Sequence, residues 1–258
     1  MRNRGGGRRP ALKAQDSSRL VLLPSYNSGP LLARTVGQAL EHWPTVWAVV
    51  DGSTDGSAAA LEAMTAGHPG LRVISLAQNQ GKGGAVLHAM GIALDAGFSH
   101  VLVMDADGQH PPDRIPEFME CSIFHPEAMI LGLPQFGDDA PLERVYGRYA
   151  GNFLAWVETG GIVRDSLFGF RVYPITPSLK AMNTTRHGRR YDFDTELAVR
   201  LIWAGTHAIQ RPVPVFYPPT TQGGISHFAY WRDNLLLAKT HARLCLLGIA
   251  RLLGYRIL

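Results

Sequence analysis

Two aspartates separated by one residue follow a short apolar stretch near the middle of the chain. Residues 101–104 are the four consecutive apolar residues of an expected buried strand, and Asp105 and Asp107 come directly after it. Carboxylates beside apolar walls are costly unless a cation compensates them, and oxygen ligands in this arrangement suit Mg²⁺ or Mn²⁺. The first hypothesis is therefore a divalent metal ion that holds phosphate groups. The alternative is an ordinary strand end followed by an Asp-Gly turn.

Three earlier apolar stretches also end in polar or glycine-rich loops, and a helical pattern follows each of them. These strands are expected at residues 19–24, 46–50 and 71–76, ahead of the strand at 101–104. Strands that alternate with helices are typical of a parallel α/β sheet, in which the carboxyl ends of the strands share one edge. The loops that should meet in one crevice at this edge contain Tyr26, Asp51, Lys82 and Asp105.

The glycine-rich loops do not match the common phosphate-binding motifs. The segment NQGKGG at residues 79–84 lacks the spacing of a GxxxxGK[ST] loop, and Val86 occupies the place where GxGxxG requires its last glycine. A nucleotide site of the P-loop or dehydrogenase type is therefore not expected.

Beyond the fourth strand the regular alternation fades, but further elements are still expected. Helices are predicted at residues 113–124 and 191–205, strands at 128–133 and 208–216, and a turn into a strand at 165–174. The predicted fold class is α/β with a mostly parallel central sheet. The tryptophans in apolar company are expected in the core, namely Trp43, Trp47, Trp156 and Trp203.

Several charged residues of the second half have two possible roles. Arg144, Arg148 and Asn152 follow one another at i and i+4, which places both guanidinium groups on one helix face. They either bind a phosphate or belong to a solvated basic face. Asp194 lies near the start of the expected helix at 191–205, where an acid serves either the helix dipole or chemistry.

The bulk properties are those of an ordinary globular chain of 258 residues. Hydrophobic residues make up 46% and charged residues 18%, and the formal net charge of +4 is too mild to indicate a nucleic-acid partner. The two cysteines, Cys121 and Cys245, have no CxxC spacing, which favours a reduced cytoplasmic setting and offers no thiolate zinc site. No window approaches the roughly 20 apolar residues of a membrane span.

The chain is expected to form one domain with two appendages. Residues 1–17 are basic and glycine-rich and are predicted to be a disordered tail, and residues 18–225 form the α/β domain. Residues 226–258 alternate leucine clusters with basic residues, which predicts an amphipathic helical segment. This segment either caps the core or lies on an anionic membrane surface.

Taken together, the loops resemble those of the family 2 glycosyltransferases, and within them the dolichol-phosphate mannosyltransferase-like branch. MDADGQHPP at residues 104–112 matches the metal motif of this branch almost letter for letter. The resemblance covers about residues 20–218 and implies a GT-A (Rossmann-like) nucleotide-sugar-binding fold. Four further segments are similar to family motifs in the same order: LLPSYN at 22–27, VVDGSTDGS at 49–57, NQGKGGA at 79–85 and DSLFGFRVYP at 165–174.

The resemblance also implies roles for individual residues. Mg²⁺ or Mn²⁺ on the donor diphosphate would be held by Asp105, Asp107 and Gln109. The nucleotide would contact Pro24, Tyr26, Asp51, Lys82, Asp105 and Ala106, with Asp51 receiving the base. The acceptor would face Arg144, Arg148 and Arg171.

Some positions depart from the family pattern. Val50 replaces the first aspartate of a DDGS pair, Ser28 stands where a glutamate is usual, and Phe168 replaces a small residue before GF. LGLPQFG at residues 131–137 also lacks an arginine that the mannosyltransferases place there. These departures leave open whether the donor is GDP- or UDP-linked and whether the acceptor is a polyprenyl phosphate.

The predicted function is metal-dependent, inverting transfer of a sugar from a nucleotide-diphosphate sugar to a lipid-type acceptor, either a polyprenyl phosphate or another lipid or polyene. The enzyme would act in peripheral contact with the cytoplasmic face of a membrane. A phosphate acceptor is already ionised, whereas a hydroxyl acceptor needs a base. The candidates for that base are Asp165 and Asp194.

Two other functions compete with sugar transfer. A strand that ends in DADG also resembles the nucleophile motif of haloacid-dehalogenase-like phosphatases, with Asp105 as nucleophile and GDD at residues 137–139 as distal acids. That nucleophile usually follows the first strand of the domain, whereas three nucleotide-type loops precede Asp105. The other alternative is a membrane-associated nucleotide-binding module without catalytic turnover.

Overall fold

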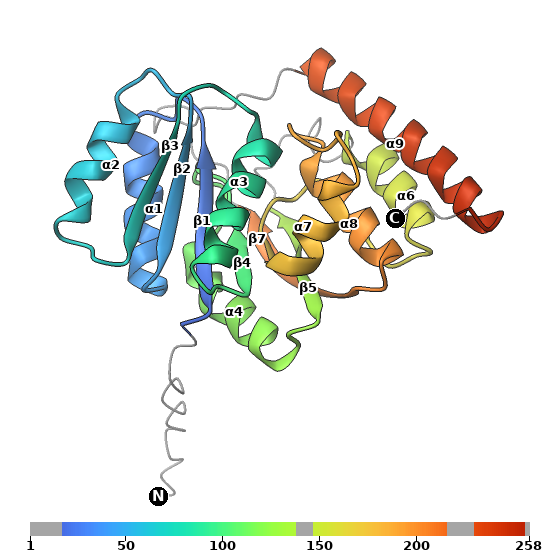
Figure 1. Cartoon of the computed structure of the whole chain (residues 1–258), viewed down its shortest axis with the longest axis horizontal. Helices are drawn as coiled ribbons and strands as arrows, with labels where there is room; N and C mark the ends of the chain where they lie inside the picture. The colour runs from blue at the N-terminus through green and yellow to red at the C-terminus, as the bar shows by residue number, and fades with distance from the viewer. Residues whose placement is uncertain (1–16, 138–146, 216–229, 256–258) are drawn as a thin grey trace, which may run out of the picture.

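The strands of this chain pair into one seven-stranded sheet in the described part of a computed structural model (Figure 1). The order across the sheet is β3-β2-β1-β4-β6-β5-β7. β1 (Arg19–Ser25) lies between β2 (Val46–Asp51) and β4 (His100–Val103), β3 (Leu71–Leu76) forms one edge, and all of these pairs are parallel. The residues that the structure describes are 17–137, 147–215 and 230–255.

One strand of the described sheet runs against the others. β6 (Arg171–Pro174) is inserted antiparallel between β4 and β5 (Ala128–Phe136), and β7 (His207–Val215) pairs in parallel with β5 at the far edge. The sheet is therefore mostly parallel, as predicted. The carboxyl ends of β1, β2 and β4 meet at one edge, where the loops predicted to carry the chemistry begin.

Helices cover both faces of the sheet, because the strands alternate their side chains between two apolar cores. In β1, Val21 and Leu23 enter one core, and Leu20 and Leu22 enter the other. The first core is covered by α1 (Pro30–His42), α2 (Ser57–Thr65) and α4 (Ile115–Phe124). The second is covered by α3 (Lys82–Asp95), α7 (Ile175–Asn183) and α8 (Phe193–Trp203).

Two helices, α6 (Arg148–Glu158) and α9 (Tyr230–Leu252), lie outside these layers. Figure 1 shows α9, in red, running along the outer side of α6 and α8. The leucine- and arginine-rich segment thus caps the domain, which is one of its two expected uses.

Some expectations about the elements need correction. The helix expected from residue 113 begins as a short 3-10 turn, Pro112–Arg114, and becomes α-helical only at Ile115. Helix α7 was not predicted, although it buries Ile175, Ser178, Ala181 and Met182 at helical spacing. Trp156 is 47% exposed rather than in the core, because α6 is covered on one side only.

Candidate active site

A lysine and two aspartates from three different elements form an ion cluster at the edge where β4 ends. The Nζ atom of Lys82, the first residue of α3, lies 2.7 Å from Asp105 Oδ1 and 2.7 Å from Asp194 Oδ2 in the first turn of α8. Burial alone would lower the pKa of Lys82, but the two carboxylates raise it, so the ammonium stays charged. The cluster brings together three predicted site residues that are up to 112 positions apart.

Asp105 is the member of this cluster that reaches solvent, with 31% of its side chain exposed. Burial would raise its pKa, but the charge of Lys82 and its hydrogen bond hold the pKa below its ordinary value. Asp107 behaves in the opposite way, because burial and then the charge of Asp105 raise its pKa. Among the described residues, its carboxylate accepts a single hydrogen bond, from the backbone N–H of Gln109 at 3.0 Å. Asp107 thus forms no ion pair with a cation among the described residues, although the charge of Lys82 lowers its pKa in part.

This arrangement fits a metal ion that substrate oxygens help to hold. No group of three or more His, Cys, Asp or Glu side chains in the described ranges is placed to bind a metal. Mg²⁺ commonly takes only one or two protein carboxylates and completes its octahedron with water and substrate phosphates. The two carboxylates of Asp105 and Asp107 offer donors of this kind, and Gln109 is bound to Asp107 through its backbone N–H in the same loop. A cation there would also relieve the repulsion that raises the pKa of Asp107.

His110 holds the backbone of the loop that contains Asp105 and Asp107. Its Nδ1 accepts a 2.9 Å hydrogen bond from the backbone N–H of Asp105, and its buried ring packs edge-on against Phe168 and Phe170. Burial lowers the pKa of His110, so the imidazole is neutral. Because Nδ1 is the acceptor, the proton of the neutral ring is on Nε2, 3.8 Å from Asp105 Oδ2. The bulky Phe168 thus holds the histidine that positions Asp105.

Asp51, at the end of β2, shapes the loop that leads into α3. Its two carboxylate oxygens accept the backbone N–H groups of Gln80 and Gly81, at 2.7 and 2.8 Å. Burial raises the pKa of Asp51, and these two hydrogen bonds lower it in part. Nearby, Tyr26 is partly exposed, whereas Pro24 is buried within β1. The role of Asp51 in receiving a nucleotide base stays a prediction.

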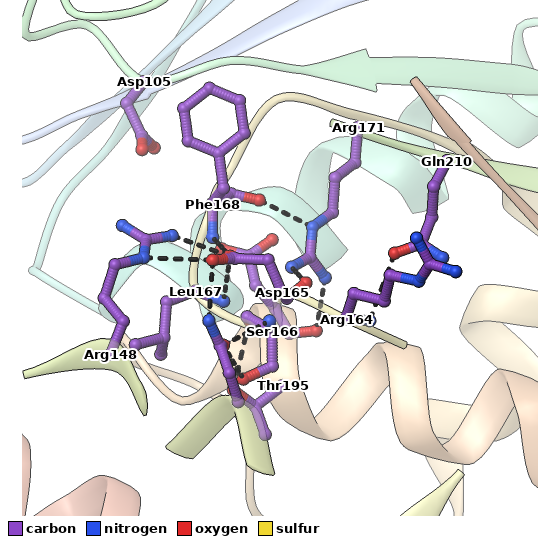
Figure 2. A network of polar contacts seen from close by, with 12 residues as sticks. Asp105, Arg148, Arg164, Asp165, Ser166, Leu167, Phe168, Arg171, Thr195 and Gln210 are labelled. Carbon is purple, nitrogen blue, oxygen red and sulfur yellow. Dashed lines mark hydrogen bonds and ion pairs between the residues drawn. The ribbon is translucent and has the colours of Figure 1, made fainter. Parts of the chain in front are cut away.

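Asp165 is the centre of a dense hydrogen-bond network (Figure 2). Arg148 donates to it through two nitrogens, at 3.0 and 2.6 Å, and Asn152 donates at 2.8 Å. The backbone N–H groups of Leu167 and Phe168 add two more hydrogen bonds. Burial would raise the pKa of Asp165, but Arg148 holds it below its ordinary value. Asp165 is therefore a poor proton acceptor, and Arg148 is already paired.

Arg171 lies in the interior and not on a ligand-facing surface. Its guanidinium is fully buried and donates to the backbone oxygens of Phe168, Asp165 and Asp194 (Figure 2). The expectation that Arg171 faces an acceptor does not fit this placement. A buried arginine on β6 instead fixes the backbone around two of the aspartates.

Two residues near the crevice were not predicted from the sequence. Arg190, in the loop before α8, interacts electrostatically with Asp51, and its guanidinium makes no hydrogen bond or ion pair within the described part of the chain. The loop packs so closely on Gly81 that a Cβ atom there would lie 2.8 Å from Arg190 Cγ. Tyr191, the next residue, interacts electrostatically with Lys82 and Asp105. The sequence feature that could have indicated them is the segment GRRYD at residues 188–192, which places two arginines and a tyrosine directly before an expected helix.

A glycine lies directly above the ion cluster. A Cβ atom at Gly169 would lie 2.6 Å from Lys82 Nζ and 2.7 Å from Asp105 Oδ2, so a side chain would displace the pair. The glycine of the FGF segment is therefore required by this close approach. Other predicted residues lie outside the described ranges, namely Arg144, the acids Asp138 and Asp139, and the SHF segment at 226–228.

The family model for Glycosyl transferase family 2 matches residues 20–177, more than half of the chain. The chain therefore belongs to this family of glycosyltransferases. An undecaprenyl-phosphate mannosyltransferase of Micrococcus luteus is 24% identical over 201 residues, covering 75% of this chain and 82% of the relative. A polyprenol monophosphomannose synthase of Mycolicibacterium smegmatis is 26% identical over 218 residues, covering 82% of each.

The fold is also that of solved GT-A enzymes. A glucosyl-3-phosphoglycerate synthase from Mycobacterium tuberculosis, in complex with Mn²⁺, UDP-glucose and phosphoglyceric acid, superposes with a TM-score of 0.60 at 16% identity. The match covers 87% of this chain and 80% of that one. The predicted GT-A fold is thus confirmed. The family match favours sugar transfer over the phosphatase alternative, and Asp105 indeed follows the fourth strand rather than the first.

None of the described helices combines the length and the apolar character needed to cross a bilayer.

Proposed function

We propose that this enzyme transfers a sugar from a nucleotide-diphosphate sugar to a polyprenyl-phosphate acceptor at the cytoplasmic face of a membrane. The observation that carries the proposal is that both candidate bases are already paired with cations. Asp165 is bound by Arg148, and Asp194 is bound by Lys82. A hydroxyl acceptor needs a base to remove its proton, whereas a phosphate oxygen is ionised at neutral pH. The names of the two relatives, which specify undecaprenyl phosphate and a polyprenol monophosphate, support the same acceptor.

The donor side of the site is proposed to need Mg²⁺ or Mn²⁺ held by Asp105, Asp107 and Gln109. When bound, the metal would supply Lewis-acid neutralisation of the departing diphosphate. The residues fit this role because Asp107 forms no ion pair within the described part of the chain and the charge of Asp105 raises its pKa. The M. tuberculosis neighbour was solved with Mn²⁺, and in another structure with Mg²⁺ and UDP.

Two cationic side chains, those of Lys82 and Arg190, are proposed to act on the donor side of the site. Lys82 holds Asp105 and Asp194 in fixed positions, so the carboxylates do not reorganise during the reaction. Arg190 is proposed to bind the donor nucleotide, because it is exposed, interacts electrostatically with Asp51, and its guanidinium makes no hydrogen bond or ion pair with the described residues. Direct attack by the acceptor phosphate oxygen on the anomeric carbon, with the nucleoside diphosphate leaving, inverts the configuration there.

The decisive experiment compares the wild-type protein with Asp107→Asn. Each is incubated with GDP- and UDP-linked sugars, a polyprenyl phosphate and Mn²⁺, and transfer of label into the lipid phase is measured. We expect at least a roughly 100-fold loss of transfer in Asp107→Asn, because charge stabilisation of the leaving group is lost. Asp113→Asn, an exposed acid close to the same loop, is the matched control and should keep full activity.

The donor is identified by a thermal-shift panel. A nucleotide sugar that binds the native state raises its stability by mass action, and it should do so more strongly with Mn²⁺ than without. Full transfer by Asp107→Asn would refute the metal assignment. Transfer to a simple alcohol that equals transfer to the polyprenyl phosphate would refute the phosphate acceptor.

A further inference from the structure

Helix α9 has two faces of different character. The inner face buries Asp233, Leu237, Thr240, His241 and Leu244. The outer face carries a row of exposed apolar residues at helical spacing, and three of its members, Trp231, Leu246 and Leu253, are 85%, 69% and 72% exposed. We call this row the outer stripe; it consists of Trp231, Leu235, Ala238, Ala242, Leu246, Ile249 and Leu253.

Buried ion pairs on the inner face keep the outer stripe turned away from the domain. Arg243 of α9 pairs with the fully buried Glu196 of α8, and His241 lies 3.0 Å from the buried Glu158 of α6. Rotating the helix to bury the stripe would separate Arg243 from Glu196 and His241 from Glu158, and the buried Glu196 would lose a cation, which is costly in a protein interior. The exposure of the stripe is therefore fixed by the packing of the helix.

The charges around the stripe are of one sign. Lys239 and Arg232 are exposed on α9, and Arg232 also pairs with the buried Asp233, the single acidic residue of Tyr230–Leu252. Arg251 is exposed too, but it donates a hydrogen bond to the backbone oxygen of Trp203 on α8. A helix with an apolar stripe and exposed basic residues is the type that lies at the interface of an anionic bilayer, with the apolar side chains below the headgroups and the cations among them. The charge pattern thus favours a lipid surface.

The first half of α9 is connected to the catalytic crevice. Thr240 donates a 3.3 Å hydrogen bond to Asp192, which also accepts the backbone N–H groups of Gly188 and Arg190. Tyr191 interacts electrostatically with Lys82 and Asp105 on one side and with Asp233 and Arg232 of α9 on the other. A surface that contacts α9 therefore lies close to the site of sugar transfer.

We propose that the outer stripe of α9 docks on an anionic phospholipid bilayer and holds the crevice beside the membrane. This inference deepens the proposed function, since a polyprenyl-phosphate acceptor would reside in that membrane. Charge complementarity selects a bilayer over a second copy of the chain, because two such helices face to face would bring their exposed cations together.

The test measures binding of the full chain to vesicles in the absence of donor and acceptor. Vesicles of phosphatidylcholine with phosphatidylglycerol are compared with vesicles of phosphatidylcholine alone in a sedimentation assay. The double variant Leu246→Glu/Ile249→Glu should bind the anionic vesicles about 10-fold or more weakly than the wild type. Phe124→Glu, an equally exposed aromatic residue at the end of α4, is the matched control and should bind as the wild type.

Further measurements distinguish membrane docking from misfolding of the variant and from the proposed sugar transfer. Circular dichroism should show unchanged folding of the double variant, since both side chains are exposed. The fluorescence of Trp231 should shift to the blue on anionic vesicles, and Trp231→Phe should lose most of that shift. Asp107→Asn should bind vesicles normally although it transfers no sugar.

Three results would overturn the docking proposal. One is vesicle binding by the double variant equal to that of the wild type. Another is no preference of the wild type for anionic vesicles. The third is a wild-type dimer in sedimentation velocity that the double variant dissociates while neither binds vesicles, which would identify a second copy as the partner.

Discussion

Two ion clusters begin in the first turn of α8, and they differ in the sign of their excess charge and in their exposure to solvent. Asp194 points to Lys82 and Asp105 at the crevice, and Glu196, two residues later, points to Arg200 and Arg243 on the side of α9. The crevice cluster reaches solvent through Asp105 and has an excess of negative charge, to which the neighbouring Asp107 adds. The Glu196 cluster has two cations for one fully buried carboxylate, and its most exposed member, Arg243, has 22% of its side chain exposed.

This difference distinguishes a ligand-binding site from a structural contact between helices. A solvent-exposed cluster with excess negative charge is stabilised when a cation binds to it. A largely buried cluster whose carboxylate is already paired has no such site for a ligand. The same residue types on one helix turn therefore serve ligand binding on one side and the attachment of α9 on the other. The first two predictions below each test one of the two clusters, and the last two test residues that surround the crevice.

The largest effect is expected for Lys82→Met. Two carboxylates would remain close together without their shared cation, so we expect transfer activity to fall about 1,000-fold. The free energy of unfolding should fall by about 2–4 kcal/mol, since one partner of a buried pair is lost. Activity assays and urea unfolding measure the two effects. Lys82→Arg, which keeps the charge, should fold normally and retain part of the activity. A Lys82→Met variant within threefold of wild-type activity would contradict the assignment.

Glu196→Gln is expected to lower the stability of the fold with little effect on transfer activity. It leaves Arg200 and Arg243 without a counterion, so the free energy of unfolding should fall by about 2–4 kcal/mol. The specific activity per folded molecule should stay within about twofold of the wild type in detergent, because Glu196 does not contact the crevice cluster. Glu62→Gln, an exposed acid on α2, is the control for the loss of a charge. Loss of activity at full stability would mean that the two clusters are not separate.

Asp165→Asn is predicted to change the pH dependence of stability. The pKa of Asp165 is lower in the folded chain than in the unfolded chain. Above the pKa of the unfolded state, about 3.9, such a carboxyl makes its full contribution to the free energy of unfolding. This contribution is lost as pH falls through the pKa of the folded state. At pH 7 the variant should therefore lose about 2 kcal/mol, and its difference from the wild type should shrink below about pH 4. Urea unfolding at several pH values measures this difference.

A control and a second readout accompany this prediction. Asp95→Asn, at the exposed end of α3, should leave stability unchanged at pH 7. If Asp165 were the catalytic base, Asp165→Asn would abolish transfer, whereas a role in positioning the loop should reduce it only about tenfold. A gap that stays constant down to pH 2 would contradict the ion pair with Arg148.

The smallest effect is expected for Arg190→Ala. An exposed arginine that binds the donor contributes mainly to ground-state affinity, so we expect KM for the donor to rise about tenfold with kcat nearly unchanged. Arg186→Ala, an exposed arginine in the same loop, is the matched control. Equal KM values for the two variants would exclude Arg190 from the donor site.

The sequence by itself determined the sheet and the place of the site. Apolar runs that end in polar loops predict parallel strands, and the carboxyl ends of parallel strands share an edge, so Lys82 and Asp105 could be assigned to one crevice. This inference succeeds because it rests on local patterns and on a general rule of topology. It also found Asp194 as a candidate, although only as one of several acids in a first helical turn.

Only the tertiary structure decided which charge meets which. Asp194 and Glu196 look equivalent in sequence, yet one faces Lys82 and the other faces Arg243, because the packing of α9 on α8 determines the surroundings of each. Arg171 resembled a ligand-binding residue and is instead fully buried. Partner choice and burial depend on contacts between segments far apart in the chain, and periodicity carries no information about such contacts.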